Sequence, residues 1–290
     1  MRLSRSVFAA ATALSSAGGL GREALRLWWR SNPGRLAAAL SFYSLFSLAP
    51  VLVVAVAVAG AIFGEQAARG ELVAQVSRLV GPAGAQVIQN VLARAGRQPA
   101  AQWLSAAGLL ASFLGATAVF AELQDGLNTI WGLPPSGAGL LRILRDRLLA
   151  FAMVVLVGLL LLVSLVAGAV LATLLRWFGP ALEHAGLLRA LSLASSLAGA
   201  ILVFALIYKF LPQARVAWRD VWAGAVAGGF LFVLGQSAIG WYLSASTFGS
   251  VYGAAGSLAA LLVWIYYSAQ ILYLGAALTH ACSRRRYGPD

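Results

Sequence analysis

The chain has 290 residues, of which 61% are hydrophobic and only 10% are charged. Soluble domains carry about 25% charged residues, so this composition argues against an ordinary soluble enzyme, a secreted disulfide scaffold and a disordered protein. One cysteine, Cys282, cannot form an intrachain disulfide, and two histidines, His184 and His280, leave little from which to build a zinc site. We therefore interpret the chain as an integral membrane protein.

Six segments are nearly free of charged residues over about 20 residues, the length that crosses a bilayer. Because lipid offers the backbone no hydrogen-bond partners, each of these segments is predicted to be helical. The expected fold class is all-α, a polytopic membrane bundle with six transmembrane helices. The predicted spans are residues 36–64, 98–121, 148–175, 187–208, 221–243 and 251–281.

The residues before the first span predict an N-terminal helix that lies on the membrane surface. Arg22, Arg26 and Arg30 recur at every fourth position, and Leu25, Trp28 and Trp29 lie on another side of the helix. Cationic and aromatic faces of this kind are typical of interfacial helices.

Two prolines are expected to shape the first span. Ser31 or Asn32 can cap the helix that follows, and Pro33 suits its first turn. Pro50 falls inside the span, where it removes one backbone hydrogen bond and is expected to kink the helix.

The same span carries three serines at a spacing of three, Ser41, Ser44 and Ser47, which lead toward Pro50. Polar groups at membrane depth are costly and are therefore candidates for function. Serines also allow helices to pack closely, as does the spacing Gly224-x-x-x-Gly228. Cavity lining and helix packing both remain open interpretations of the serine stripe.

Apolar residues recur at helical spacing in the longest external connection, residues 65–101, on both sides of a Gly-Pro pair. This pattern predicts two short amphipathic helices, which either cap the bundle or lie on the outer leaflet.

Charged and polar residues end the second and fourth predicted spans at the same membrane boundary. Glu122, Asp125 and Asn128 share a helix face through their spacing of three. Lys209, the only lysine, ends the fourth span. Lys209 either pairs with Glu122 or Asp125, or extends to the headgroups while the acids sit in water.

The last two predicted helices carry the most polar side chains. Tyr266, Gln270 and Tyr273 follow the spacing i, i+4, i+7, and Gln236 lies on the helix before. Gln270 should lie well inside the bilayer and therefore needs an interhelical hydrogen bond or a wet cavity. Together with the serine stripe and Pro50, these four residues are the candidate lining of a polar cavity.

Basic residues in the connections predict the orientation. A cytoplasmic N-terminus places 15 of the 21 arginines and lysines on the cytoplasmic side, which favours cytoplasmic N- and C-termini. The net charge of +12 then needs no nucleic acid to explain it. The expected partners are membrane lipids, and a homo-oligomer or an envelope protein partner is left open.

The sequence contains no metal-binding or nucleotide-binding motif. We therefore expect no catalytic, cofactor-binding or metal-binding residues, and no enzymatic activity. The whole chain, residues 1–290, is expected to form one membrane domain, with a cytoplasmic or interfacial helix in 1–32, a bundle in 33–282 and a cytoplasmic tail in 283–290.

Several strings, in their order along the chain, resemble the YihY/BrkB family of bacterial inner-membrane proteins. They lie at residues 37–50 (AAALSFYSLFSLAP), 128–131 (NTIW), 208–212 (YKFLP), 252–253 (YG), 262–266 (LVWIY) and 274–276 (LGA), and the match covers about residues 20–282. The resemblance implies six transmembrane helices with cytoplasmic termini. The ribonuclease label that the family once carried has no support here, because a histidine-rich metal cluster is missing.

The resemblance also implies a connection with the bacterial envelope, since members of this family have been suspected of handling envelope lipids. The family typically has an acidic residue near the Leu-Gly-Ala segment of the last helix. This chain has Leu278, Thr279 and His280 there, so the resemblance does not extend to a proton-coupled role at that point.

The leading hypothesis is a non-enzymatic inner-membrane protein that transports or accommodates an envelope lipid or another amphipathic molecule. The alternative is a structural or partner-binding scaffold for envelope integrity. A third hypothesis is a lipid-modifying enzyme that uses Glu122 or Asp125 as a base.

Overall fold

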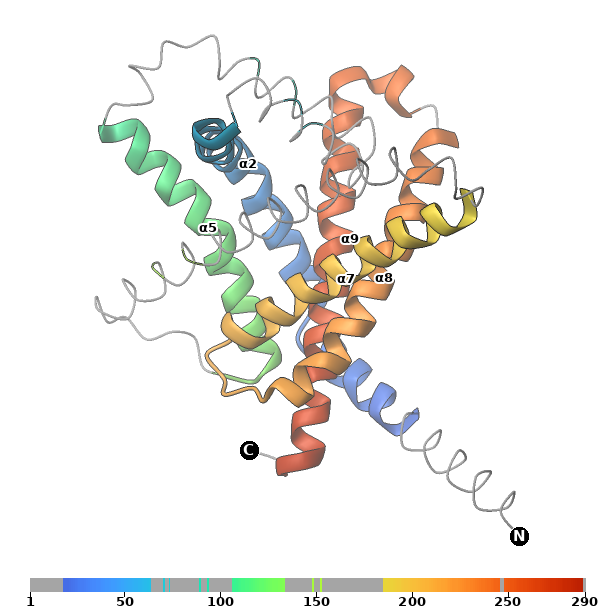
Figure 1. Ribbon diagram of the computed structural model, residues 1–290. Coiled ribbons are helices and arrows are strands. Elements are labelled where there is room, and N and C mark those ends of the chain that lie inside the picture. The colour runs from blue at the N-terminus through green and yellow to red at the C-terminus, as the bar shows by residue number, and fades with distance from the viewer. Residues whose placement is uncertain are drawn as a thin grey trace.

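The computed structural model describes residues 18–63, 106–133, 185–245 and 248–288, together with the isolated residues 70, 73, 89, 93, 148 and 152. Across these ranges the chain is helical and contains no strand, which confirms the all-α class (Figure 1). The helices are residues 18–30, here called the N-terminal helix, followed by α2 (Pro33–Phe63), α5 (Ala106–Ile130), α7 (Ala185–Phe210), α8 (Trp218–Ala245) and α9 (Phe248–Tyr287).

Five of the predicted spans overlap described helices, namely α2, α5, α7, α8 and α9. The second span was predicted too early in the chain, at 98–121, whereas α5 covers Ala106–Ile130. Within the described ranges, three helices are long and apolar enough to cross a membrane, over Leu193–Phe210, Trp218–Ala238 and Leu258–Tyr287. The predicted third span lies outside the described residues, as do the two amphipathic helices of 65–101, apart from isolated positions. The count of six spans therefore stays a prediction. The segment expected as a tail from residue 283 continues α9 as far as Tyr287.

The helices converge at one end of the molecule, where α8 begins and α5, α7 and α9 end (Figure 1). We call it the basic end because it carries Lys209, Arg215, Arg219 and residues 284–286, which are all arginines. α8 and α9 are antiparallel neighbours, α7 packs against α8, and α2 packs against both α5 and α9.

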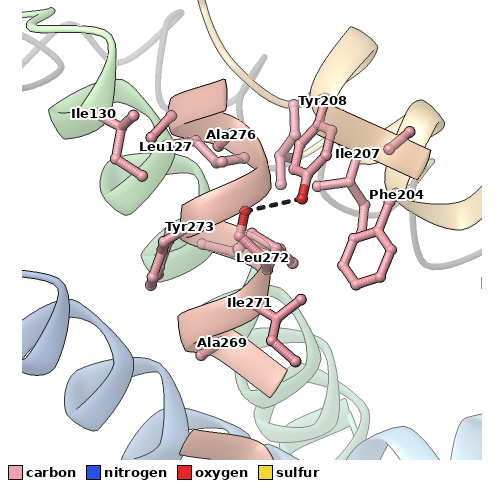
Figure 2. Packing of buried hydrophobic residues seen from close by; sticks show 14 of the residues in the cluster. Leu127, Ile130, Phe204, Ile207, Tyr208, Ala269, Ile271, Leu272, Tyr273 and Ala276 are labelled. Carbon is pink, nitrogen blue, oxygen red and sulfur yellow. Dashed lines mark hydrogen bonds between the residues drawn. The ribbon is translucent and has the colours of Figure 1, made fainter. Parts of the chain in front are cut away.

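The hydrophobic core lies toward the basic end and surrounds α9 (Figure 2). Tyr208, Leu127 and Tyr273 are among its largest fully buried side chains. The Tyr208 hydroxyl donates to the Leu272 carbonyl at 2.9 Å, so a polar bond from α7 to α9 runs through the core. Burying a tyrosine hydroxyl is favourable only when the hydroxyl has such a partner.

Glycines allow α8 and α9 to approach each other closely. A Cβ atom at Gly224 would meet the carbonyl oxygen of Gly275 and the hydroxyl of Thr279. At Gly228 the nearest group to an added Cβ would be the Tyr208 hydroxyl, at 3.1 Å. Gly224 therefore allows α8 to approach α9, and Gly228 leaves room for Tyr208 of α7, as small residues do in membrane bundles.

Local capping separates the N-terminal helix from α2. The Ser31 hydroxyl donates to the Trp28 carbonyl at 2.6 Å, so it caps the helix that ends rather than the one that begins. Asn32 has a φ of 52°, and its carbonyl accepts the first hydrogen bond of α2, from the Arg35 amide at 3.0 Å. Asparagine tolerates this left-handed conformation, and Pro33 then occupies the first turn as predicted.

Gly132 ends α5. It has a φ of 66°, its amide bonds to the Thr129 carbonyl at 3.1 Å, and the Leu133 amide bonds to the Asn128 carbonyl at 2.9 Å. This pair of bonds is the Schellman motif, which requires a left-handed residue and so favours glycine. The turn fixes the direction in which the end of α5 meets the rest of the basic end.

α2 continues through Pro50 as one helix. Figure 1 shows that it changes direction along its length, since one part lies across the view and the other is seen nearly along its axis. Such a bend is expected of a helix with an internal proline, because the missing backbone hydrogen bond opens the helix locally.

Candidate functional site

Two amide side chains tie α5 to the end of α7 at the basic end. Gln124 Nε2 donates to the Leu211 carbonyl at 3.0 Å. The Asn128 side-chain oxygen accepts a hydrogen bond from the Gln213 amide at 3.0 Å. Both Gln124 and Asn128 are buried, so these bonds satisfy backbone groups that would otherwise be costly away from water.

His280 links the end of α9 to the end of α5. Its Nδ1 lies 3.0 Å from the Ile130 carbonyl, and its ring stacks on Trp131 with the ring centroids 4.5 Å apart. Because a carbonyl can only accept, Nδ1 carries the proton in this contact. The His280 side chain is buried.

Asp220 lies in the first turn of α8, where a carboxylate interacts favourably with the helix dipole. It is 1% exposed, and its Oδ1 lies 2.8 Å from Nη1 of Arg286. Next to this pair, Arg285 Nε lies 3.3 Å from Glu23 Oε2 of the N-terminal helix. The last turn of α9 is therefore bound to two other helices. We call Gln124, Asn128, Tyr208, Asp220 and His280 the basic-end cluster.

Lys209 belongs to the same end of the molecule. Its Nζ donates to the Val216 carbonyl at 2.5 Å and lies 5.6 Å from the centre of the Trp218 ring. These contacts hold the turn between α7 and α8. The pairing of Lys209 with Glu122 or Asp125 that the sequence leaves open stays a prediction.

Glu122 and Asp125 lie on α5, which packs against α2 and α9. Glu122 lies just beyond the predicted end of the second span. Burial and the nearby Asp125 carboxylate raise the pKa of Glu122, and attraction by Arg35 of α2 partly opposes that rise. Both acids also interact electrostatically with Tyr273 of α9. Charges from two helices thus meet beside a buried tyrosine of a third.

Tyr266 and Gln270 lie on the same side of α9, toward the first turn of α2. Gln270 Nε2 donates to the Tyr266 hydroxyl at 2.9 Å. A Cβ at Gly34 would lie 3.4 Å from that hydroxyl, which places Tyr266 against α2. The Gln270 oxygen is buried and has no hydrogen-bond partner among the described residues.

Tyr273 fills the space left by a glycine of α5. It is fully buried, and a Cβ at Gly126 would lie 2.5 Å from its hydroxyl. In the part of the chain that the structure describes, the Tyr273 hydroxyl has no hydrogen-bond partner. We call the group made by α2, α5 and α9 the polar site; its members are Arg35, Glu122, Asp125, Tyr266, Gln270 and Tyr273.

The serine stripe of α2 makes its hydrogen bonds within its own helix. The Ser41 hydroxyl donates to the Ala37 carbonyl at 2.7 Å, and the Ser47 hydroxyl donates to the Ser44 carbonyl at 3.1 Å. Ser44 is half-buried, as is Gln236 on α8. The structure does not describe the side chain of Pro50.

Sequence reasoning missed Gln124, Tyr208, Asp220 and His280 as interhelical contacts. The signal that could have found them is their position: each lies within a few residues of the end or start of a predicted span, where helices meet connections. Within the described ranges, no group of three or more histidine, cysteine, aspartate or glutamate side chains could hold a metal ion.

Long apolar helices, close glycine contacts and a basic end together define a polytopic helical membrane protein. The family model described as Virulence factor BrkB matches residues 24–290. The chain therefore belongs to the BrkB family, and the resemblance found in the sequence is confirmed.

Curated relatives carry the name UPF0761 membrane protein. The chain is 29% identical to one from Ralstonia nicotianae over 89% of its own length and 57% of the relative's. It is 33% identical to one from Verminephrobacter eiseniae over 85% and 58% of the two lengths, and 28% identical to one from Nitrosospira multiformis over 90% and 60%. The chain thus spans about three fifths of the length of these relatives. No solved structure shows a significant match to the chain.

Proposed function

We propose that this protein is a non-enzymatic transporter or carrier of an envelope lipid or another amphipathic molecule in the bacterial inner membrane. The observation that carries the proposal is the polar site, where Gln270 and Tyr273 bury polar atoms that have no partner among the described residues. In a bilayer such atoms are costly unless they meet water or a polar ligand. A headgroup passing between α2, α5 and α9 would supply that partner.

The surroundings of the polar site support an amphipathic ligand in particular. Arg35 and Glu122 provide charges that a headgroup can contact, while aromatic side chains of α2 lie exposed nearby in sequence, with Phe42 58% and Phe46 66% exposed. A ligand with a polar head and hydrocarbon chains would match both environments at once.

The test is a lipid-transfer assay on the full chain reconstituted into liposomes. A fluorescent phospholipid placed in one leaflet should redistribute faster with the protein than without it, as measured by dithionite quenching of the outer leaflet. An unchanged distribution for phosphatidylethanolamine, phosphatidylglycerol and cardiolipin analogues alike would contradict the proposal.

A pair of tyrosines on α9 provides matched variants. Tyr273→Phe removes a hydroxyl without a partner among the described residues, whereas Tyr267→Phe removes one that donates to the Leu231 carbonyl of α8 at 3.3 Å. We expect Tyr273→Phe to slow transfer at unchanged thermal stability. Tyr267→Phe should lower stability and leave transfer per folded molecule unchanged, so the reverse pattern would count against a role for the polar site.

The second candidate function is a structural or partner-binding scaffold for envelope integrity. The hydroxyls of Ser41 and Ser47, which bond within α2, favour it because they contribute to helix packing rather than to a cavity. Under this alternative, loss of envelope integrity in cells should follow loss of folded protein for every variant, including Tyr273→Phe.

We also propose that the basic end faces the cytoplasm. Lys209, Arg215, Arg219 and the three arginines at 284–286 lie there, and basic residues are retained on the cytoplasmic side during insertion. A C-terminal fluorescent protein should therefore fold and fluoresce, while a C-terminal alkaline phosphatase should be inactive. An active phosphatase fusion would contradict this orientation.

A further inference from the structure

The N-terminal helix has two different sides. Ala24 is buried and Trp28 packs against the hydrophobic core. Arg26, Arg30 and Trp29 face outward, with Trp29 74% exposed. The helix is thus attached to the bundle by one side and presents cations and an indole ring on the other.

An apolar groove runs where the N-terminal helix meets α8 and α9. Its volume is about 200 Å³. An apolar cavity of about 150 Å³ is large enough to bind benzene, so this groove can take a segment of hydrocarbon chain. Its lining includes Gly21 and Leu25 of the N-terminal helix, Ala227 and Leu231 of α8, and Leu274 and Leu278 of α9.

A second, shallower concavity adjoins the groove. It has a volume of about 510 Å³, and Leu25 lines both hollows. The rest of its lining consists of Arg26, Arg30, Trp28 and Trp29. The Trp28 indole nitrogen is buried and has no hydrogen-bond partner among the described residues. A hydrocarbon-sized groove therefore leads directly to two cations.

We propose that these two hollows form a binding site for an anionic phospholipid, with one acyl chain in the groove and the phosphate on Arg26 and Arg30. Guanidinium groups bind phosphate oxygens through paired hydrogen bonds, and tryptophan favours the level of the headgroups. The site is separate from the polar site, and the inference does not require the protein to transport lipids.

The charge balance selects an anionic lipid over a zwitterionic one. Over the described residues, Arg26 and Arg30 form no ion pair with a carboxylate, and Glu23, the only acid of the N-terminal helix, lies beside Arg285. The positive charge of the concavity is therefore left for the ligand to balance. A zwitterionic headgroup would bring a second cation into the same place.

The experiment compares lipids retained by the full chain after purification in mild detergent, measured by native mass spectrometry with equal amounts of phosphatidylglycerol and phosphatidylethanolamine added. We expect phosphatidylglycerol to be retained preferentially. The double variant Arg26→Gln/Arg30→Gln should weaken that retention by about thirtyfold, since each arginine contributes to the attraction of an anionic headgroup.

Three further variants make the result specific. Arg215→Gln/Arg219→Gln removes the same charge from exposed positions outside both hollows and should change retention little. Ala227→Phe should fill the groove and reduce retention without altering charge, and Trp28→Phe should reduce it by a few fold. Equal retention of the two lipids, or an equal loss in both double arginine variants, would overturn the proposal.

A stability measurement provides an independent readout. A lipid that binds the folded protein raises its melting temperature, so added phosphatidylglycerol should stabilise the wild type but not Arg26→Gln/Arg30→Gln. Stabilisation of both proteins to the same extent would also overturn the proposal. Lipid transfer in liposomes is measured separately, so this site can fail while the transport proposal stands, and the converse also holds.

Discussion

The basic-end cluster and the polar site both place polar side chains among apolar helices, but their hydrogen bonding differs. In the cluster, Gln124, Tyr208 and His280 each contact a backbone carbonyl of another helix or connection. In the polar site, Gln270 and Tyr273 keep buried polar atoms without partners among the described residues. In the cluster, Nδ2 of Asn128 also has no hydrogen-bond partner among the described residues. The comparison therefore concerns Gln124, Tyr208 and His280, which hold helices together, and Gln270 and Tyr273, which leave binding capacity.

This difference has an energetic meaning. Removing one partner of a buried hydrogen bond costs about 1–3 kcal/mol, because the other partner is left without water or protein. Removing a polar atom that has no partner costs nothing of that kind and can stabilise the fold. Mutations in the two regions should therefore separate stability from activity, and four predictions test that separation, beginning with the largest effect.

Gly224→Ala should have the largest effect on stability. The added Cβ would meet the Gly275 carbonyl, which is backbone and cannot rotate away, so we expect a loss of about 3 kcal/mol or more. Gly199→Ala in α7 is the matched control, because no atom lies within 4 Å of its added Cβ. It should be neutral or about 0.5–1 kcal/mol more stable. Thermal unfolding in detergent measures both; equal melting temperatures would refute the close α8–α9 contact.

Arg286→Gln should be the next most damaging change. It leaves the carboxylate of Asp220 buried without its cation. We expect a cost of about 2 kcal/mol, below the 3–5 kcal/mol of fully buried pairs, since the Arg286 side chain is 44% exposed. Adding Asp220→Asn should recover part of the loss, because the uncompensated charge is then gone. A double variant less stable than Arg286→Gln, in equilibrium unfolding, would contradict this pairing.

Two glutamines compare the regions directly. Gln124→Leu should cost about 1–2 kcal/mol, because the Leu211 carbonyl loses its donor. Gln270→Leu should cost less than Gln124→Leu. The bond it removes, from Nε2 to the Tyr266 hydroxyl, is exposed, and a buried oxygen without a partner among the described residues is removed with it. Transfer activity should show the opposite order, with Gln270→Leu the more severe. If both variants lose stability equally, the two regions do not differ as described.

The sequence was sufficient to predict the helices because long uncharged segments admit few alternatives in a bilayer. Five predicted spans overlap described helices, and Pro33 starts α2 as expected. The individual contacts could not be predicted, because hydropathy does not report which helices are neighbours. His280 shows this: its sequence position suggests an interface, yet its burial depends on where Ile130 and Trp131 end α5.

The candidate site was only partly accessible from the sequence for the same reason. The spacing of Tyr266, Gln270 and Tyr273 correctly places them along one helix, but their surroundings depend on α2 and α5. Among the four predicted boundary residues, Asn128 and Lys209 form hydrogen bonds at the turn between α7 and α8, and the charges of Glu122 and Asp125 act on Tyr273.

The smallest effect concerns pH and the charge of the polar site. Burial and Asp125 raise the pKa of Glu122 above its usual 4.5, so the folded state binds this proton more tightly than the unfolded state. The associated stability is present below about pH 4.5 and is lost as the pH rises through the raised pKa. Glu122→Gln should remove this loss, and Asp125→Asn should narrow its pH range. Melting temperatures of both proteins between pH 4 and 7 measure the effect. A wild-type melting temperature that rises with pH relative to that of Glu122→Gln would contradict the predicted sign.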